Sequence, residues 1–81
     1  MTATIKLFAG ARDMMGVDEI KVDLPNRANF GDLRDALFTK APPLEPLAEQ
    51  ALFAANACYV TDEELVPEST EIALILPVSG G

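Results

Sequence analysis

Residues 18–37, DEIKVDLPNRANFGDLRDAL, change from one hydrophobic period to another, and this change indicates the fold class. Over Asp18–Leu24 apolar and polar residues alternate, which is typical of a β-strand with one buried face. Pro25 and Asn26 end this strand, and Asn29 is placed to cap a helix, with Asp32 at the capping-box position. The apolar residues that follow recur at helical spacing: Phe30, Leu33, Ala36 and Leu37. The chain is therefore predicted to run from a half-buried strand directly into an amphipathic helix.

A second alternating segment precedes this one, at Thr2–Ala9. Its apolar residues Ile5 and Leu7 fall on one face of the expected strand, and Phe8 falls on the other. Two strands this close in sequence favour an antiparallel hairpin. Between them the sequence predicts a short helical turn that ends at Gly16, which suits a left-handed C-cap.

The remainder of the chain is predicted to return to the sheet, because Pro42 and Pro43 end the helix. Residues 71–78 form the most apolar strand, which we expect at the centre of the sheet beside the first strand. Three short elements are expected in between: a second helix over residues 46–52, a strand over residues 55–61 and an extended piece at residues 65–66. This order predicts an α+β fold, the β-grasp or ubiquitin-like fold, with a mixed sheet and one main helix packed on one face.

The composition narrows the class of protein. The 81 residues suit a single domain with a flexible C-terminal tail at residues 77–81. The chain shows no signal peptide, no membrane span and only one cysteine, which predicts a cytoplasmic protein. Thirteen acidic and six basic residues give a net charge of −7, which argues against nucleic acid and fits either simple solubility or a basic protein partner. Without histidine or a glycine-rich phosphate-binding motif, its own side chains are poor candidates for catalysis.

The last strand is apolar on both faces. Alternation turns Ile72 and Leu74 toward the helix, and Phe8 on the first strand points the other way. The outward residues of the last strand are Ala73, Ile75 and Pro77. An apolar patch on the open side of a small sheet indicates a docking surface, unless a loop covers that side.

The tail at residues 77–81, PVSGG, spans about 16–18 Å when fully extended. Pro77 favours an extended course, and Gly80 and Gly81 have no side chain, so the tail can enter a narrow tunnel in a partner. There the reactive group would be the terminal carboxylate, which is an anion at neutral pH and needs activation, for example as an acyl-adenylate formed from ATP. A Cβ at residue 80 or 81 would crowd the attacking nucleophile. The alternative is an inert, frayed end.

Four segments resemble the small subunits of molybdopterin synthase, the MoaD-type ubiquitin-like sulfur carriers. The likeness extends over essentially the whole chain, and its most specific parts include Arg12, Gly16, Ala54 and Asn56. Residues 68–70 and Leu76 depart from the family's usual Asp-Gly-Asp turn and proline pair, which leaves the subgroup open. The segments are IKLFAGARDMMG (5–16), LRDAL (33–37), ANACYVTDEEL (55–65) and EIALILPVSGG (71–81).

The resemblance implies a sulfur carrier. An ATP-dependent, ubiquitin-activating-type enzyme would adenylate Gly81, beside Gly80, and a sulfur donor would convert the adenylate to a thiocarboxylate. The thiocarboxylate sulfur would then attack a cyclic pyranopterin phosphate, forming the dithiolene of molybdopterin. Catalytic side chains would belong to the large subunit of a heterotetramer, so this chain would be a non-catalytic subunit that binds no cofactor or metal. The residues expected to bind the large subunit are Phe8, Ile75, Pro77, Val78 and Ser79.

Other functions stay open at this point. The same tail chemistry serves sulfur carriers for thiamin, tRNA thiolation or cysteine synthesis, and a ubiquitin-like modifier would join Gly81 to lysines instead. A structural subunit with an inert tail is the third alternative. Cys58 is expected to be a small buried hydrophobe in a strand rather than a reactive thiol, and Asn56 to satisfy backbone groups at a strand start.

Overall fold

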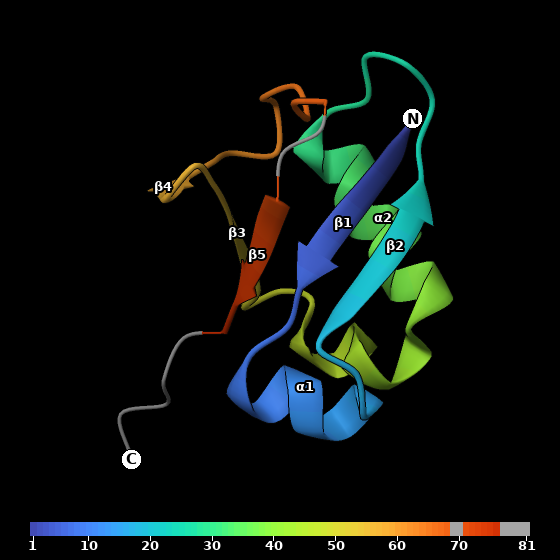
Figure 1. Ribbon diagram of the computed structural model, residues 1–81, viewed down its shortest axis with the longest axis vertical. Coiled ribbons are helices and arrows are strands. Elements are labelled where there is room, and N and C mark those ends of the chain that lie inside the picture. Colours follow the sequence, from blue (N-terminus) through green and yellow to red (C-terminus); the bar gives the residue numbers. More distant parts are fainter. Residues whose placement is uncertain (69–70, 77–81) are drawn as a thin grey trace.

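The computed structural model describes residues 1–68 and 71–76 (Figure 1). One five-stranded sheet carries the longer helix, α2, on one of its faces. The elements are β1 (Thr2–Lys6), α1 (Ala9–Met15), β2 (Glu19–Asp23), α2 (Phe30–Lys40), the 3-10 helix η1 (Pro42–Leu47), β3 (Leu52–Ala55), β4 (Cys58–Tyr59) and β5 (Glu71–Ile75).

The strands lie in the order β2-β1-β5-β3-β4. β1 and β2 form the predicted antiparallel hairpin, and β5 lies at the centre of the sheet, parallel to β1, as its apolar sequence predicts. The pairs β3·β5 and β3·β4 are antiparallel, so the sheet is mixed. The predicted β-grasp fold, with a mixed sheet and one main helix on one face, is confirmed.

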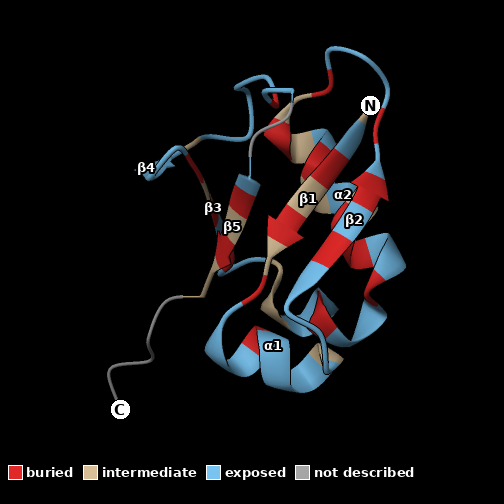
Figure 2. Ribbon diagram, in the orientation of Figure 1, coloured by how far each residue is buried: buried red, intermediate tan, exposed pale blue. Residues whose placement is uncertain are grey.

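The core lies between the sheet and α2 (Figure 2). Ile5 and Ile72 are neighbours on β1 and β5, and each has no exposed surface. Phe30 and Phe53 join helix to sheet, with ring centroids 6.1 Å apart. Alternation along the strands thus buries one face of the sheet, as the period of two predicts.

The predicted ends of the helices are confirmed. The Asn29 side chain accepts a hydrogen bond from the Asp32 N–H at 2.8 Å, and an Asp32 carboxylate oxygen accepts one from the Asn29 N–H at 3.1 Å. α2 ends at Lys40, and its C-cap Ala41 directly precedes the two prolines. Gly16 caps α1 in the left-handed conformation, with φ 70°.

Two predicted elements are wrong. In place of a second α-helix over residues 46–52, a 3-10 helix begins at Pro42, and Leu52 already belongs to β3. The single strand over residues 55–61 is instead a hairpin, because Asn56 and Ala57 adopt φ values of 54° and 64° and reverse the chain. Two consecutive positive φ values define the tight turn that best matches the twist of paired strands. Asn56 therefore lies in a turn and not at a strand start.

Candidate docking face

The face of the sheet opposite α2 is divided into a charged half and an apolar half. β2 presents exposed charged residues on this face, and Lys6 of β1 lies beside them. On the other three strands the residues of this face are apolar except Glu71, the first residue of β5. The apolar ones are Leu52, Ala54, Tyr59, Ala73 and Ile75. We call these five residues, together with Phe8, the apolar patch.

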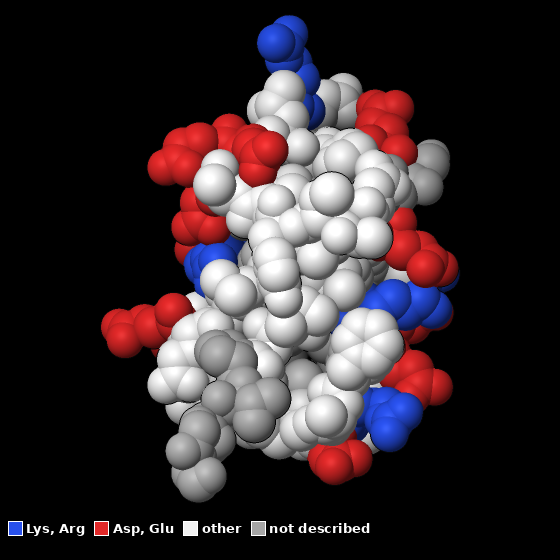
Figure 3. All heavy atoms as spheres, turned by 90° about the vertical axis from the view of Figure 1, so that its left-hand side faces the viewer, with Lys and Arg blue, Asp and Glu red and all other residues white. Residues whose placement is uncertain are grey.

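The pairing of the strands brings the members of the apolar patch together. Leu52 lies opposite Ile75, and Ala54 lies between Ala73 and Tyr59. Leu52 and Tyr59 are 45% and 68% exposed, so the described residues do not cover them. Figure 3 shows the side of the molecule that carries these strands, with uncharged residues across its middle and charged groups of both signs along its margins.

Phe8 belongs to this surface but not to a strand. The sequence placed it on the outward face of the first strand, whereas β1 ends at Lys6 and Phe8 is the residue that precedes α1. Its backbone is still extended, and the Leu7 N–H donates to the Asp18 carbonyl at 2.8 Å, which carries the hairpin past the end of β1. Its side chain is 52% exposed, as an outward residue should be.

Lys6 marks the border between the two halves. Its ammonium lies 3.2 Å from a Glu19 carboxylate oxygen and 3.9 Å from one of Glu71. The hydrogen bond and the charge of Glu19, followed by the charge of Glu71, raise the pKa of Lys6 above its ordinary value. Lys6 therefore interacts with one carboxylate on each neighbouring strand, Glu19 of β2 and Glu71 of β5.

The tail continues from the edge of the apolar patch. β5 ends at Ile75, and Leu76 packs partly buried against the core. The other predicted site residues, Pro77, Val78, Ser79, Gly80 and Gly81, lie outside the described residues, and their roles stay predictions.

Sequence analysis missed three members of the apolar patch, namely Leu52, Ala54 and Tyr59. The available signal was the turn-forming Asn56, which follows the short apolar run LFAA at 52–55. The expectation for Cys58 was wrong for the same reason, since its place in the short edge strand β4 leaves it exposed.

Three features are absent from residues 1–68 and 71–76. In this part of the chain no group of three or more histidine, cysteine or acidic residues is placed to hold a metal ion. No side-chain polar atom there is buried without a hydrogen-bond partner. None of the described helices has the length and apolar character that crossing a membrane requires.

Known proteins are similar to this chain in both sequence and fold. The sequence profile of the ThiS family matches residues 5–81. The molybdopterin synthase sulfur carrier subunit of Arabidopsis thaliana is 35% identical over 77 residues, which cover 95% of this chain and 80% of that protein. The protein of the same name from Chlamydomonas reinhardtii is 32% identical and covers 100% of both chains. The crystal structure of SAMP1, small archaeal modifier protein 1, from Haloferax volcanii has a TM-score of 0.86 at 29% identity, with 100% of both chains covered.

The matches extend along nearly the entire chain and include the C-terminal residues that the structure leaves undescribed. The four sequence segments on which the resemblance to sulfur carriers rests all lie within residues 5–81. That resemblance is confirmed, and the chain belongs to the ThiS family.

Proposed function

We propose that this protein is the sulfur carrier subunit of a molybdopterin synthase. The observation that carries the proposal is its identity of 35% and 32%, over nearly its full length, to two proteins that bear this name. The apolar patch supports this proposal, because another protein must bind the carrier while its tail reacts. The patch includes Ile75, so it ends one residue before Leu76 and the tail.

The proposed reaction takes place at Gly81. An adenylating enzyme transfers AMP from ATP to the carboxylate and releases pyrophosphate. A sulfur donor then displaces AMP, so that one carboxylate oxygen is replaced by sulfur. In the synthase, the thiocarboxylate sulfur forms a bond to a side-chain carbon of the cyclic pyranopterin phosphate, and a carbon–oxygen bond at that carbon breaks so that its oxygen leaves. Water then cleaves the bond between that sulfur and the Gly81 carbonyl carbon, and a second charged carrier supplies the second sulfur of the dithiolene. Gly81 returns as a carboxylate and is ready for another cycle.

This chemistry needs partners. The large subunit of the synthase would bind the apolar patch, accept residues 77–81 in its active site and supply the catalytic side chains in a heterotetramer. An anionic pterin phosphate needs a basic site, and a basic large subunit matches a carrier of net charge −7. Because activation uses ATP, we place the carrier in the cytoplasm.

A protein modifier is the second candidate, because a structure of small archaeal modifier protein 1 matches this fold at 29% identity. A modifier would use the same Gly81 adenylate but transfer the acyl group to a lysine amine. The bond formed would be an isopeptide bond, and AMP would leave without any gain of sulfur.

The two functions are separated by mass spectrometry of the intact chain. The chain is incubated with ATP, the adenylating enzyme and sulfide, and a sulfur carrier gains the mass difference between sulfur and oxygen. The product is then mixed with the large subunit and the pterin substrate, where the gained mass should disappear as molybdopterin forms. Conjugates to lysines without any thiocarboxylate would contradict the proposal and support the modifier.

A further inference from the structure

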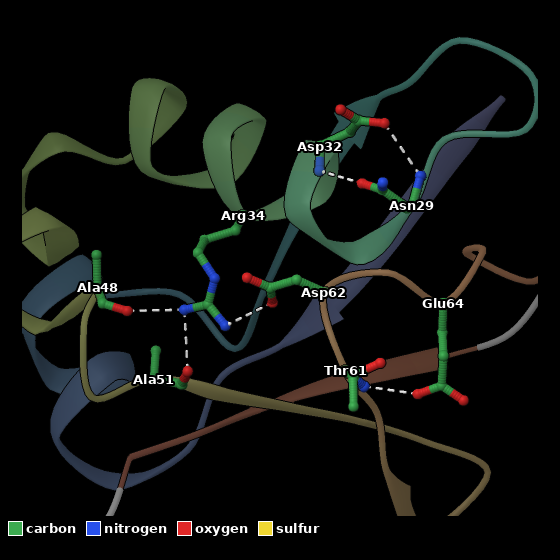
Figure 4. Close-up of polar contacts among 8 residues, drawn as sticks. All are labelled: Asn29, Asp32, Arg34, Ala48, Ala51, Thr61, Asp62 and Glu64. Atoms are coloured by element: carbon green, nitrogen blue, oxygen red, sulfur yellow. Dashed lines mark hydrogen bonds and ion pairs between the residues drawn. The ribbon is translucent and has the colours of Figure 1, made fainter.

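Arg34 of α2 makes the largest set of long-range side-chain hydrogen bonds among the described residues (Figure 4). Its Nη1 donates to the carbonyl oxygens of Ala48 at 2.7 Å and Ala51 at 2.9 Å. Its Nη2 donates to a carboxylate oxygen of Asp62 at 3.1 Å. The guanidinium lies over the ring of Phe53, 5.2 Å from its centroid.

These contacts surround the β3–β4 hairpin. Ala51 is the residue directly before β3, Phe53 lies inside β3, and Asp62 follows β4 in the chain. One side chain thus contacts the hairpin before its first strand, within it and after its second strand. Arginine suits this position because its planar fork donates in several fixed directions, whereas lysine offers a single point charge.

The hairpin carries half of the apolar patch on its other face. Phe53 is buried toward α2, so Leu52 and Ala54 point away from it, and Tyr59 lies opposite Ala54. Among the described strands β4 pairs only with β3. The position of Tyr59 therefore depends on the contacts made by the segment after β4. We call these contacts the anchor, and the hydrogen bond from Arg34 to Asp62 is one of them.

The anchor also includes the backbone. The carbonyl of Asp62 accepts a hydrogen bond from the Gly31 N–H at 2.9 Å, and that of Glu64 accepts one from the Phe30 N–H at 2.9 Å. The first turn of α2 and Arg34, one turn later, thus hold the same loop. These contacts connect α2 to the segment that follows the hairpin.

We infer that Arg34 is a positioning residue for partner docking, which sets the place of Leu52 and Tyr59 in the apolar patch without touching the partner. The inference rests on the proposed function, since the partner is the large synthase subunit. Arg34 acts from the covered face of the sheet, and the partner binds the uncovered face. Its effect on binding must therefore pass through the hairpin.

The binding experiment uses Arg34→Lys, which keeps the positive charge but replaces the planar guanidinium with a single ammonium. Titration calorimetry should show that the affinity for the large subunit falls about tenfold. A loss of this size lies within the range of interaction energies measured between residues in contact. The control Arg27→Lys makes the same chemical change at an exposed turn and should stay within about twofold. Asp62→Asn, which retains both carbonyl contacts of Arg34, should give an intermediate loss.

A double-mutant cycle tests whether the effect passes through the patch. In a Leu52→Ala, Tyr59→Ala background, Arg34→Lys should lower affinity by less than about twofold, because the residues that it positions are gone. A loss of the same factor in both backgrounds would overturn the inference. Unchanged affinity of Arg34→Lys in the otherwise unsubstituted chain would also overturn it.

Hydrogen exchange gives a measurement that needs no partner. The Val60 N–H, which donates to the Phe53 carbonyl inside the hairpin, should exchange at least about tenfold faster in Arg34→Lys. The Leu7 N–H, in the β1–β2 hairpin, should change by less than about twofold. Equal acceleration at both amides, or none, would mean a merely structural arginine and would overturn the inference. If the unsubstituted chain fails to bind the large subunit, the proposed function fails, and this measurement alone decides the role of Arg34.

Discussion

Leu52 and Ile75 are direct neighbours across β3 and β5, on the face of the sheet that α2 leaves uncovered. Leu52 is the first residue of its strand and Ile75 is the last residue of β5. A partner that holds the tail as it leaves β5 therefore meets this pair first. We therefore expect binding of the sheet and positioning of the C-terminus to be coupled in one contact region.

We expect substitutions in the apolar patch to weaken the complex more than the fold. Phe8→Ala removes an aromatic side chain that is 52% exposed, so the free energy of unfolding should change by less than about 0.5 kcal/mol. As an anchor at an interface, the same residue should contribute about 2 kcal/mol to binding. Ile75→Glu should weaken binding too, because it places a charge inside the patch. Titration calorimetry and thermal melts measure the two effects.

Leu65→Ala is the matched control for these variants. Leu65 is similarly exposed, at 55%, but forms a bridge with Asn29 at the start of α2. Its affinity for the large subunit should equal that of the unsubstituted chain. Patch variants that bind normally but melt earlier would show that Phe8 and Ile75 act in folding alone.

Changing the length of the chain at Gly81 should abolish sulfur transfer. Deletion of Gly81, or addition of one residue after it, moves the terminal carboxylate by about 3.3–3.6 Å. Gly81 has no side chain that could pack, so the melting temperature should not change. Molybdopterin formation is the readout, and a deletion variant that still supports it would refute the proposed role of Gly81.

Gly80→Ala should separate chemistry from docking. Affinity for the large subunit should be almost unchanged, since the apolar patch and residues 77–79 would supply most of the binding. Thiocarboxylate formation or consumption should fall by up to about 100-fold, because the added methyl restricts φ and displaces the reacting carbonyl by about 1 Å. Single-turnover mass spectrometry measures the chemistry, and a binding titration measures the affinity. Equal losses in both would make the tail mainly a binding element.

Asn29→Ala should destabilise the fold without changing function. The variant loses the bond to the Asp32 N–H, at a cost of about 1 kcal/mol, which lowers the melting temperature of a domain this size by about 4–8 °C. Asn26→Ala, at an exposed turn, should leave the melting temperature within about 2 °C. Sulfur transfer at 25 °C should remain normal in both variants. Identical melting temperatures for the two variants would show that the cap contributes nothing.

The Lys6 ion pairs should make the fold less stable at alkaline pH. Because Glu19 and Glu71 raise the pKa of Lys6 above 10.5 in the folded chain, the folded state holds its proton more tightly than the unfolded state. The stabilisation is therefore complete below pH 10.5 and is lost as the pH rises through the raised pKa. Urea unfolding of Lys6→Met should show a smaller fall over this range than the unsubstituted chain. A salt concentration of about 1 M should reduce the difference, because it screens exposed charges.

Local sequence was sufficient for much of the fold. The alternation in β1 and β2, the capping pair Asn29 and Asp32 and the prolines after α2 act over a few residues, so their outcome is readable along the chain. The apolar character of β5 also predicted its central place, since only a strand covered by neighbours can bury that much apolar surface. The C-terminal glycines suggested a reactive terminal carboxylate, but an inert tail stayed open until the resemblance to sulfur carriers was added.

Tertiary structure decided the rest of the docking face. LFAA at residues 52–55 is too short to reveal its own conformation, and it becomes a strand because it pairs with β5. That pairing, and the turn at Asn56, bring Leu52 and Tyr59 into the apolar patch and leave Cys58 exposed. The partners of Arg34 lie 14, 17 and 28 residues away in sequence. Contacts over such distances depend on where the packed helix places a side chain, which no local pattern specifies.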